Sequence, residues 1–512
     1  MAVLILSGIY LPTVFTAFQR HDDYAILFNF PGLNFTECKK MSEYSSTLGS
    51  GRPITAELQF CEIGHLYGHF PGGKFFISLR VLSLLFLIIT FSLFSSWLAA
   101  FLDFSFVTAV ILSTLIFTLP GFHFFIAQAV AASNSFGFLL ALLASLSLST
   151  PINRLNKITL STVLLILTLM TFQPHALFFF VPPAILLILP SNRDWKFSRR
   201  FIGMHLIIFL LSTLLYSLLH KFLILPMYQN FHPQAIFGGY GLMKADLGLS
   251  QLWMNLQACL KNPKLWNLWF INQPAIARLT LNFMAVSIVV ILIQKIYRAF
   301  KTRPLSQGIQ PLLEKLLLGG IILLGTLSPQ LLNGKIDYYR VTMHAAAFLV
   351  IVLTGCVLFW GQFLKERFRE RFRLTLLIFL AFTTAVLAQT HCYREYAYVS
   401  LSEFDFLETN LGPLIQGKAG TAYIGRPLKN LRNVGDEHGA YSSFFDDEYG
   451  VRGMIKLIYE RQHLDFNRLK ITNILKAHIV AVTDQELIRQ GHQEKILIDF
   501  NELLKTHQLN YP

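Results

Sequence analysis

The chain has 512 residues, of which 54% are hydrophobic and only 14% are charged. A soluble protein of this length carries about 25% charged residues, so the composition excludes an ordinary soluble protein and indicates a polytopic membrane protein. The formal net charge of +14 does not indicate a nucleic-acid-binding protein, because the basic residues are concentrated in short connections between apolar runs.

Apolar runs of about 17 to 25 residues, the length that crosses a hydrocarbon core of about 30 Å, recur along the first three quarters of the chain. They predict a mainly α fold with about eleven transmembrane helices. The predicted spans are 1–18, 76–99, 104–120, 130–149, 158–172, 175–190, 201–224, 279–297, 316–332, 342–363 and 373–390. The first run lacks a preceding basic region and a small-residue cleavage site, which favours a retained helix over a signal peptide.

Four short connections between the predicted spans are strongly basic. They contain Arg154 and Lys157; Arg193, Lys196, Arg199 and Arg200; Lys295, Arg298, Lys301, Arg303 and Lys315; and Lys365, Arg367, Arg369, Arg371 and Arg373. Cytoplasmic loops carry an excess of Lys and Arg, and one orientation places all four connections inside. We therefore expect the N-terminus inside, and 19–75, 120–129, 173–175, 225–278, 333–341 and everything after 390 outside.

The predicted organisation is a transmembrane domain at 1–390, followed by a small extracytoplasmic α/β domain at 391–512. In the second part, charged helix-periodic stretches alternate with short apolar stretches such as TAYIG and HIVAV, as in α/β folds. In the first outer loop, an oxidising compartment would allow a disulfide between Cys38 and Cys61.

Two outer loops, 19–75 and 225–278, are too long to be plain connections, and long ordered loops are often functional. The second loop contains Trp253, Trp266 and Trp269 among Leu and Lys. This mixture is typical of helices that lie in the plane of the membrane interface.

Unusual polar residues gather near the outer ends of the predicted spans. They are Asp22, Asp23, Arg52, His123, Gln128, Gln173, His175, Asp337, Tyr338, Tyr339 and Arg340. Each has an ordinary explanation of its own, such as a solvated acid pair or a polar turn around a proline. Their common location is what indicates a site, because a polar cluster at one membrane face suits a lipid-linked substrate.

Glycosyl transfer from a polyprenyl-phosphate sugar would use these groups together. A carboxylate takes the proton from an acceptor hydroxyl as its oxygen attacks the anomeric carbon, and a cation holds the departing phosphate. Asp22 and Asp23 offer the carboxylate. Arginine suits the phosphate because its planar guanidinium presents a fork of donors.

A resemblance to a known family points the same way. The first span runs directly into HDDY at 21–24 and is followed by GSGRP at 49–53, which resembles the start of GT-C superfamily membrane glycosyltransferases. The likeness is to the bacterial group of serotype-converting O-antigen glucosyltransferases. TFQPH at 171–175 is similar to their Tyr-Gln element, with Phe172 in place of Tyr. DYYRVTMHAAAFLV, beginning at Asp337, is similar to the Arg-Tyr element that opens a late span.

The resemblance implies that Asp22 or Asp23 is the catalytic base and that Arg52 and Arg340 face the lipid phosphate. It implies that Gln173, His175 and Tyr339 belong to the substrate site. The expected partners are a polyprenyl-phosphate-linked sugar donor, a glycan or glycolipid acceptor such as lipopolysaccharide O-antigen, and the lipid bilayer. The expected location is the bacterial inner membrane, with the active site on the periplasmic side.

Some members of this superfamily bind a divalent metal with the acids of the first loop, and others use none, so both alternatives stay open for this chain. No spacing typical of a metal site or a nucleotide-binding loop occurs in the sequence.

Two other functions stay open. A transporter or lipid flippase also explains many spans, but it predicts ionisable residues near the midplane, whereas the middles of the spans are mostly Leu, Ile and Phe. An O-antigen polymerase or ligase has a large outer loop late in the chain, a role that 225–278 would fill, but it does not account for HDDY. We therefore favour the glycosyltransferase.

Overall fold

The structure, a computed structural model, describes most of the transmembrane part and isolated pieces of the rest. The described residues are 1–16, 23, 36, 39, 42–43, 45–63, 66, 73–190, 192–233, 248–261, 263–270, 273–302, 305–333, 339–398, 400–402, 404–405, 408–409, 420–425, 458, 469–473 and 495–499.

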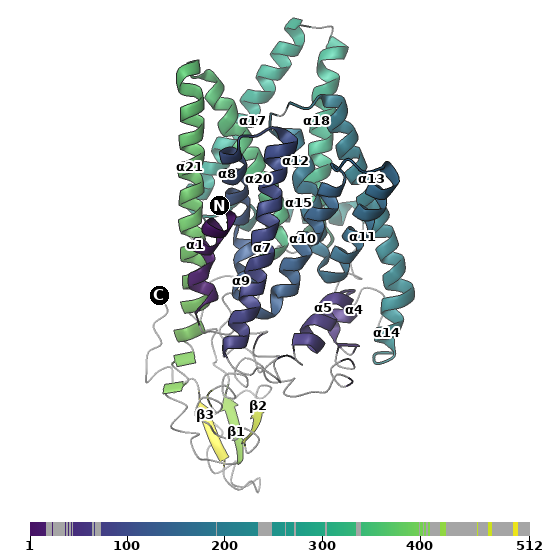
Figure 1. The fold of residues 1–512 in the computed structure, drawn as a ribbon, viewed down its shortest axis with the longest axis vertical. Coiled ribbons are helices and arrows are strands. Elements are labelled where there is room, and N and C mark those ends of the chain that lie inside the picture. The colour runs from purple at the N-terminus through teal and green to yellow at the C-terminus, as the bar shows by residue number, and fades with distance from the viewer. Residues whose placement is uncertain are drawn as a thin grey trace.

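The described elements of the first half of the transmembrane part are all helices (Figure 1). Its helices are α1 (Ala2–Val14), α4 (Ser46–Gly49), α5 (Pro53–Glu57), α7 (Gly73–Leu102), α8 (Phe106–Phe117), α9 (Pro120–Ala127), α10 (Ala132–Ser147), α11 (Arg154–Thr171) and α12 (Val181–Ile188). A π-helical turn, Leu58–Glu62, extends α5, and 3-10 segments occur at Ala129–Ala131 and Gln173–Phe180.

The second half continues in the same way. It contains α13 (Trp195–Leu219), a π-helical turn (His220–Ile224), α14 (Leu225–Gln229), α15 (Leu249–Lys261), α16 (Pro263–Trp266), α17 (Pro274–Thr302), α18 (Leu305–Thr326), α19 (Ser328–Asn333), α20 (Tyr339–Trp360), a 3-10 turn (Gly361–Phe363) and α21 (Glu366–His391), which a π-helical segment (Cys392–Tyr398) extends. The mainly α, polytopic character predicted from composition is confirmed.

Three parallel strands are described in the C-terminal part. They are β1 (Gly420–Gly425), β2 (Leu469–Asn473) and β3 (Lys495–Asp499), in the order β2-β1-β3. β1 contains the predicted strand TAYIG, whereas the stretch HIVAV and the predicted helices of this part lie outside the described residues. The α/β domain at 391–512 therefore stays a prediction.

Every predicted apolar run coincides with helix, but the count of eleven spans is not confirmed. Seven of the described helices are long and apolar enough to cross a membrane, or eight if α8 and α9 form one span bent by 70°. The bend follows from Pro120, which begins α9 and cannot donate the hydrogen bond that would continue α8. α1 and the segment Gln173–Ile188 are shorter apolar helices.

Side-chain caps begin three helices at one end of the bundle. Ser105 caps α8, Asn153 caps α11 and Asp194 caps α13, each accepting a hydrogen bond from the backbone N–H three residues ahead. These oxygens satisfy donors that the first turn of a helix leaves without a partner.

This end also gathers the basic connections. The Trp97 indole near the end of α7 donates to Ser149 (3.1 Å), next to the connection that holds Arg154. Arg193 donates to the Phe101 carbonyl at 2.9 Å. In Figure 1 the ends of α17, α18 and α21 that carry the other basic residues lie at the top, whereas α4, α5 and the strands lie at the bottom. We call these the basic end and the opposite end of the bundle.

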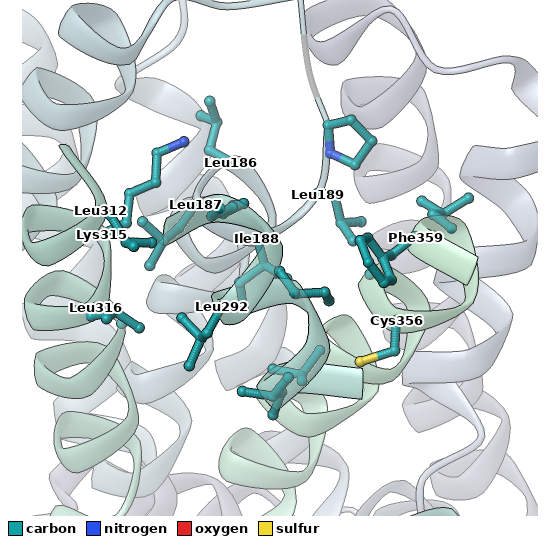
Figure 2. Close-up of a pocket in the computed structure, with 18 of the residues that line it drawn as sticks. Leu186, Leu187, Ile188, Leu189, Leu292, Leu312, Lys315, Leu316, Cys356 and Phe359 are labelled. Atoms are coloured by element: carbon teal, nitrogen blue, oxygen red, sulfur yellow. The ribbon is translucent and has the colours of Figure 1, made fainter. Parts of the chain in front are cut away.

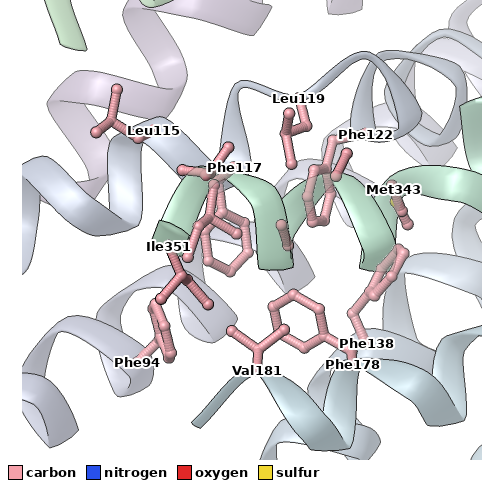
Figure 3. Packing of buried hydrophobic residues seen from close by; sticks show 14 of the residues in the cluster. Phe94, Leu115, Phe117, Leu119, Phe122, Phe138, Phe178, Val181, Met343 and Ile351 are labelled. Atoms are coloured by element: carbon pink, nitrogen blue, oxygen red, sulfur yellow. The ribbon is translucent and has the colours of Figure 1, made fainter. Parts of the chain in front are cut away.

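Phenylalanine rings fill the middle of the bundle (Figure 3). The Phe117 ring lies 5.0 Å from that of Phe122 and 5.9 Å from that of Phe178, and Phe138 and Phe94 extend the cluster. Lipid tails are as apolar as these rings, so close packing rather than exclusion of water holds the helices together. The cluster joins α7, α8, α9, α10 and the segment Gln173–Phe180 into one core.

The outer segment 225–278 does not stay at the surface throughout. Trp253 is exposed, as expected of an interfacial helix, but Trp269 is buried and donates from its indole nitrogen to the Leu115 carbonyl at 3.1 Å. A buried indole N–H needs an acceptor, and α8 supplies one, so this segment enters the bundle.

Candidate functional site

Asp23 lies inside the opposite end of the bundle, with no exposed surface. One carboxylate oxygen is 3.6 Å from a guanidinium nitrogen of Arg80 in α7, which is also fully buried. The other oxygen accepts a hydrogen bond of 3.0 Å from the backbone N–H of Val130. The carboxylate therefore ties the first outer loop to α7 and to the 3-10 turn that precedes α10.

Arg80 binds two further segments. Its Nε donates to the Ala127 carbonyl at the end of α9 (2.9 Å), and one terminal nitrogen donates to the Thr16 carbonyl just after α1 (3.1 Å). The first outer loop, the end of α9 and the residue just after α1 therefore all meet α7 at the Arg80 guanidinium. Sequence reasoning missed this residue, although the signal was present: an arginine inside an apolar run is costly unless a partner is buried with it.

These contacts suit Asp23 for anchoring rather than for proton transfer. One oxygen lies beside the Arg80 guanidinium and the other accepts from the Val130 N–H, and full burial separates the carboxylate from an aqueous acceptor. Its neighbour Asp22 lies outside the described residues.

A second set of contacts surrounds Arg52, at the start of α5. Its Nε donates to the amide oxygen of Gln173 at 2.8 Å, and its guanidinium lies 4.5 Å from the centre of the Phe172 ring. The aromatic face attracts the cation. The structure thus brings together Arg52 and Gln173, two residues that the sequence assigned to one site, and it gives Phe172 a specific contact with the arginine.

Tyr216 of α13 completes this network, and sequence reasoning missed it as well. The Gln173 amide nitrogen donates to the Tyr216 hydroxyl (2.9 Å) and to the Ser50 carbonyl (2.7 Å). The Tyr216 hydroxyl in turn donates to the Gly51 carbonyl at 2.6 Å. No sequence signal marks a lone tyrosine near the end of a long apolar helix.

Gly51 must be glycine at this point. Its φ is +81°, a conformation that costs other residues energy, and a Cβ here would collide with the Tyr216 hydroxyl. The turn therefore lets the backbone approach α13 closely and sets the position of Arg52, the next residue.

The surroundings of Arg52 and of Asp23 are connected through α5 and its extension. Thr55 donates to the Thr171 carbonyl at 2.7 Å, and Gln59 donates to the Val130 carbonyl at 3.0 Å. Val130 is also the residue whose N–H binds Asp23. The N–H and the carbonyl of Val130 therefore both hold the first outer loop against the bundle.

His175 lies behind this network in the aromatic core. It is fully buried, with ring centres 3.7 Å from Phe138, 4.8 Å from Phe125 and 4.6 Å from Phe172. The ring of His344 in α20 is 6.0 Å away. Phe172 thus contacts both Arg52 and His175, and the histidine occupies the packed interior.

The remaining site predictions fall on residues that the structure does not describe in full. Tyr339 and Arg340 form the first turn of α20, but their side chains are outside the described set, as are Asp337 and Tyr338. The side chains of Cys38 and Cys61 are outside it too, so the disulfide stays a prediction.

Within the described ranges, no group of three or more His, Cys, Asp or Glu residues is placed to hold a metal ion. The one acid of the first-loop pair that is described, Asp23, has the positive charge of Arg80 beside it, which opposes binding of a cation. Both metal alternatives stay open for Asp22.

The cavities found among the described residues lie elsewhere. One of about 550 Å³ and another of about 510 Å³ are both at the basic end, and no predicted site residue lines either of them.

Comparison with known proteins adds no neighbour to these observations. No protein-family model, no curated protein and no solved structure matches this chain.

Proposed function

We propose that this protein is a membrane glycosyltransferase of GT-C type. It transfers a sugar from a polyprenyl-phosphate donor to a cell-envelope glycan, such as lipopolysaccharide O-antigen, on the periplasmic face of a bacterial inner membrane. The observation that carries the proposal is the convergence of Asp23, Arg52 and Gln173 at the end of the bundle opposite the basic connections. At this end, an acid and an arginine of the first outer loop would meet both a lipid-linked donor and an aqueous acceptor.

The two acids have different roles in this proposal. Asp23 positions the loop through Arg80 and Val130, and Asp22 is the catalytic base. The surroundings of Asp23 support this division, because both of its oxygens are engaged by Arg80 and Val130 and none of its surface is exposed to an acceptor.

Arg52 binds the phosphate of the donor. Gln173 and Phe172 hold its guanidinium in one orientation, which reduces the ordering cost when a phosphate binds. In the reaction, Asp22 accepts the acceptor hydroxyl proton, the acceptor oxygen bonds to the anomeric carbon, and the bond from that carbon to the phosphate oxygen breaks. The lipid phosphate leaves with the electron pair, and the arginine stabilises its charge.

The test compares the surface polysaccharide of cells that make wild-type protein, Asp22→Asn or Asp103→Asn at matched membrane levels. Asp103 is an exposed acid at the basic end with a φ of +57°, a conformation that asparagine tolerates, so it controls for the charge change. We expect Asp22→Asn to remove a sugar that the wild type and the control both add, with a rate loss of roughly 10²- to 10⁴-fold.

Unchanged transfer by Asp22→Asn would refute its role as the base. An identical polysaccharide in wild-type and empty cells would count against glycosyl transfer itself.

One observation favours a second candidate, a transporter. Ionisable residues buried among membrane helices are typical of transport pathways, and Asp23 and Arg80 form such a pair. However, Arg80 binds Thr16 and Ala127 at the ends of helices and not at their middles, as a loop anchor would. Transport requires the pair itself, whereas glycosyl transfer requires only that the loop stay in place.

A further inference from the structure

A cavity of about 550 Å³ lies between α12, α13, α17, α18 and α20 at the basic end of the bundle (Figure 2). Its volume is in the range of about 300 to 1,000 Å³ that is typical of small-molecule sites. Two side chains that line it, Ile288 and Leu316, are 40% and 48% exposed. The cavity therefore reaches the apolar outer surface of the bundle, where membrane lipids lie.

The walls of the cavity are mostly aliphatic. Figure 2 shows Leu312 and Leu316 on one side, Phe359 and Cys356 on the other, and Leu186 to Leu189 between them. Glycines leave space in the wall: a Cβ at Gly320 would meet no atom within 4 Å. Such a surface fits a hydrocarbon chain and offers little to a soluble polar ligand.

Two lysines from different helices complete the lining. Lys295 comes from α17 and Lys315 from α18, and their like charges repel each other. Lys315 also lies 4.8 Å from the centre of the Trp195 ring. An anionic group placed between the two ammonium groups would convert this repulsion into two attractions.

The nearby charged groups do not neutralise these lysines. Among the described residues, the neighbouring acid Glu314 is bound by the Trp195 indole (2.9 Å) and by Arg199 (3.4 Å). Arg193, which also lines the cavity, is held against the Phe101 ring and carbonyl. An anion entering the cavity would therefore meet Lys295 and Lys315 in addition to Arg193.

The geometry points to a binding site for an anionic phospholipid from the membrane leaflet at the basic end. Its phosphate lies between Lys295 and Lys315, and one acyl chain occupies the leucine-lined cavity. Basic pockets between transmembrane helices bind anionic lipid headgroups in this way. The site is separate from the proposed transfer site and does not depend on it.

Native mass spectrometry of the full-length protein in detergent tests this assignment, with phosphatidylglycerol and phosphatidylcholine as probes. We expect the wild type to retain one phosphatidylglycerol and to prefer it over phosphatidylcholine by about 25-fold, since each lysine near a lipid surface contributes roughly fivefold. The double variant Lys295→Gln/Lys315→Gln should lose this preference. The charge-preserving double Lys295→Arg/Lys315→Arg should keep most of it.

Matched controls separate this site from the general basic surface. Lys196 and Lys365 are exposed lysines near the same end that do not line the cavity, so Lys196→Gln/Lys365→Gln should retain the preference. Gly320→Leu fills the cavity without changing charge and should reduce retention of both lipids.

Three results would overturn the assignment. They are equal retention of the two lipids by the wild type, equal loss of preference in the two Lys→Gln doubles, and competition by glycerol phosphate as strong as by the intact lipid. The last result would mean that the phosphate alone is recognised and that the acyl chain contributes nothing. Size-exclusion profiles of each variant establish that it is folded.

Discussion

The buried ion pair of Asp23 and Arg80 makes the sharpest prediction about this protein. Asp23→Asn keeps an oxygen that accepts from the Val130 N–H but removes the negative charge beside Arg80. At the observed separation of 3.6 Å, two unit charges interact by about 5 kcal/mol at an effective dielectric constant of about 20. Removing one partner of a buried pair typically costs about 3 to 5 kcal/mol, so we expect a loss of stability of this size.

Arg80→Met should be destabilising for a related reason, because it leaves the Asp23 carboxylate buried without its cation. It also removes the donors to the Ala127 and Thr16 carbonyls. The double variant Asp23→Asn/Arg80→Met buries no charge, and its loss of stability should be clearly smaller than the sum of the two single losses. The two carbonyls without donors should keep it less stable than the wild type.

Thermal unfolding of the detergent-solubilised protein measures these losses of stability. The readout is the fraction of protein that still elutes as a monodisperse peak after heating. Asp103→Asn, an exposed acid at the other end, is the control and should change the midpoint little. If either single variant unfolds at the wild-type temperature, or if the losses of the singles add in the double, the ion pair does not anchor the loop. A transporter would instead require Asp23→Asn, Arg80→Met and the double variant to lose transport even where they remain folded, whereas Asp103→Asn would keep it.

Other predictions concern the contacts around Arg52. Tyr216→Phe removes the hydroxyl that donates to the Gly51 carbonyl; it should lower the stability of the protein by about 1 to 3 kcal/mol and should also lower sugar transfer. Tyr10→Phe is the control, because it removes a similar buried hydrogen bond to the Phe117 carbonyl (2.8 Å). It should lower thermal stability without lowering transfer. Gly51→Ala should lower the unfolding midpoint and the transfer rate, because of its positive φ and the collision with Tyr216. Gly203→Ala, where a Cβ meets no atom within 4 Å, should be neutral or stabilising by up to about 1 kcal/mol. Arg52→Lys should leave the unfolding midpoint within a few degrees but reduce transfer in the polysaccharide assay, because an ammonium group lacks the planar fork.

Sequence reasoning located the helices well and the polar contacts only in part. It placed Arg52 and Gln173 in one site, and the structure joins them by a hydrogen bond. It also treated Asp22 and Asp23 as equivalent, and it overlooked both Arg80 and Tyr216. Arg80 stands out in its apolar run as a costly charge, but its partner cannot be found from the sequence, and a lone tyrosine such as Tyr216 carries no signal; the role of each depends on what packs beside it.

The number of spans shows the same limit. Hydropathy marked each apolar run, yet α1 and the segment Gln173–Ile188 are short, and α8 and α9 bend by 70°. Length along the sequence does not specify the path of a helix through the bundle, because a proline or a 3-10 turn changes direction without changing hydropathy.

Composition, hydropathy and the placement of basic residues suffice to identify a helical membrane protein with one basic end. Inside a bilayer the backbone has no water to bind, so a long apolar run must satisfy its own hydrogen bonds as a helix, and charges must collect in the connections. The pairings of distant residues come from the folded chain: Arg52 with Gln173, 121 positions apart, Asp23 with Val130, 107 apart, and Lys295 with Lys315 around one cavity. Such pairs are set by how the helices pack, because burying a polar side chain is favourable only where packing brings its partner within reach.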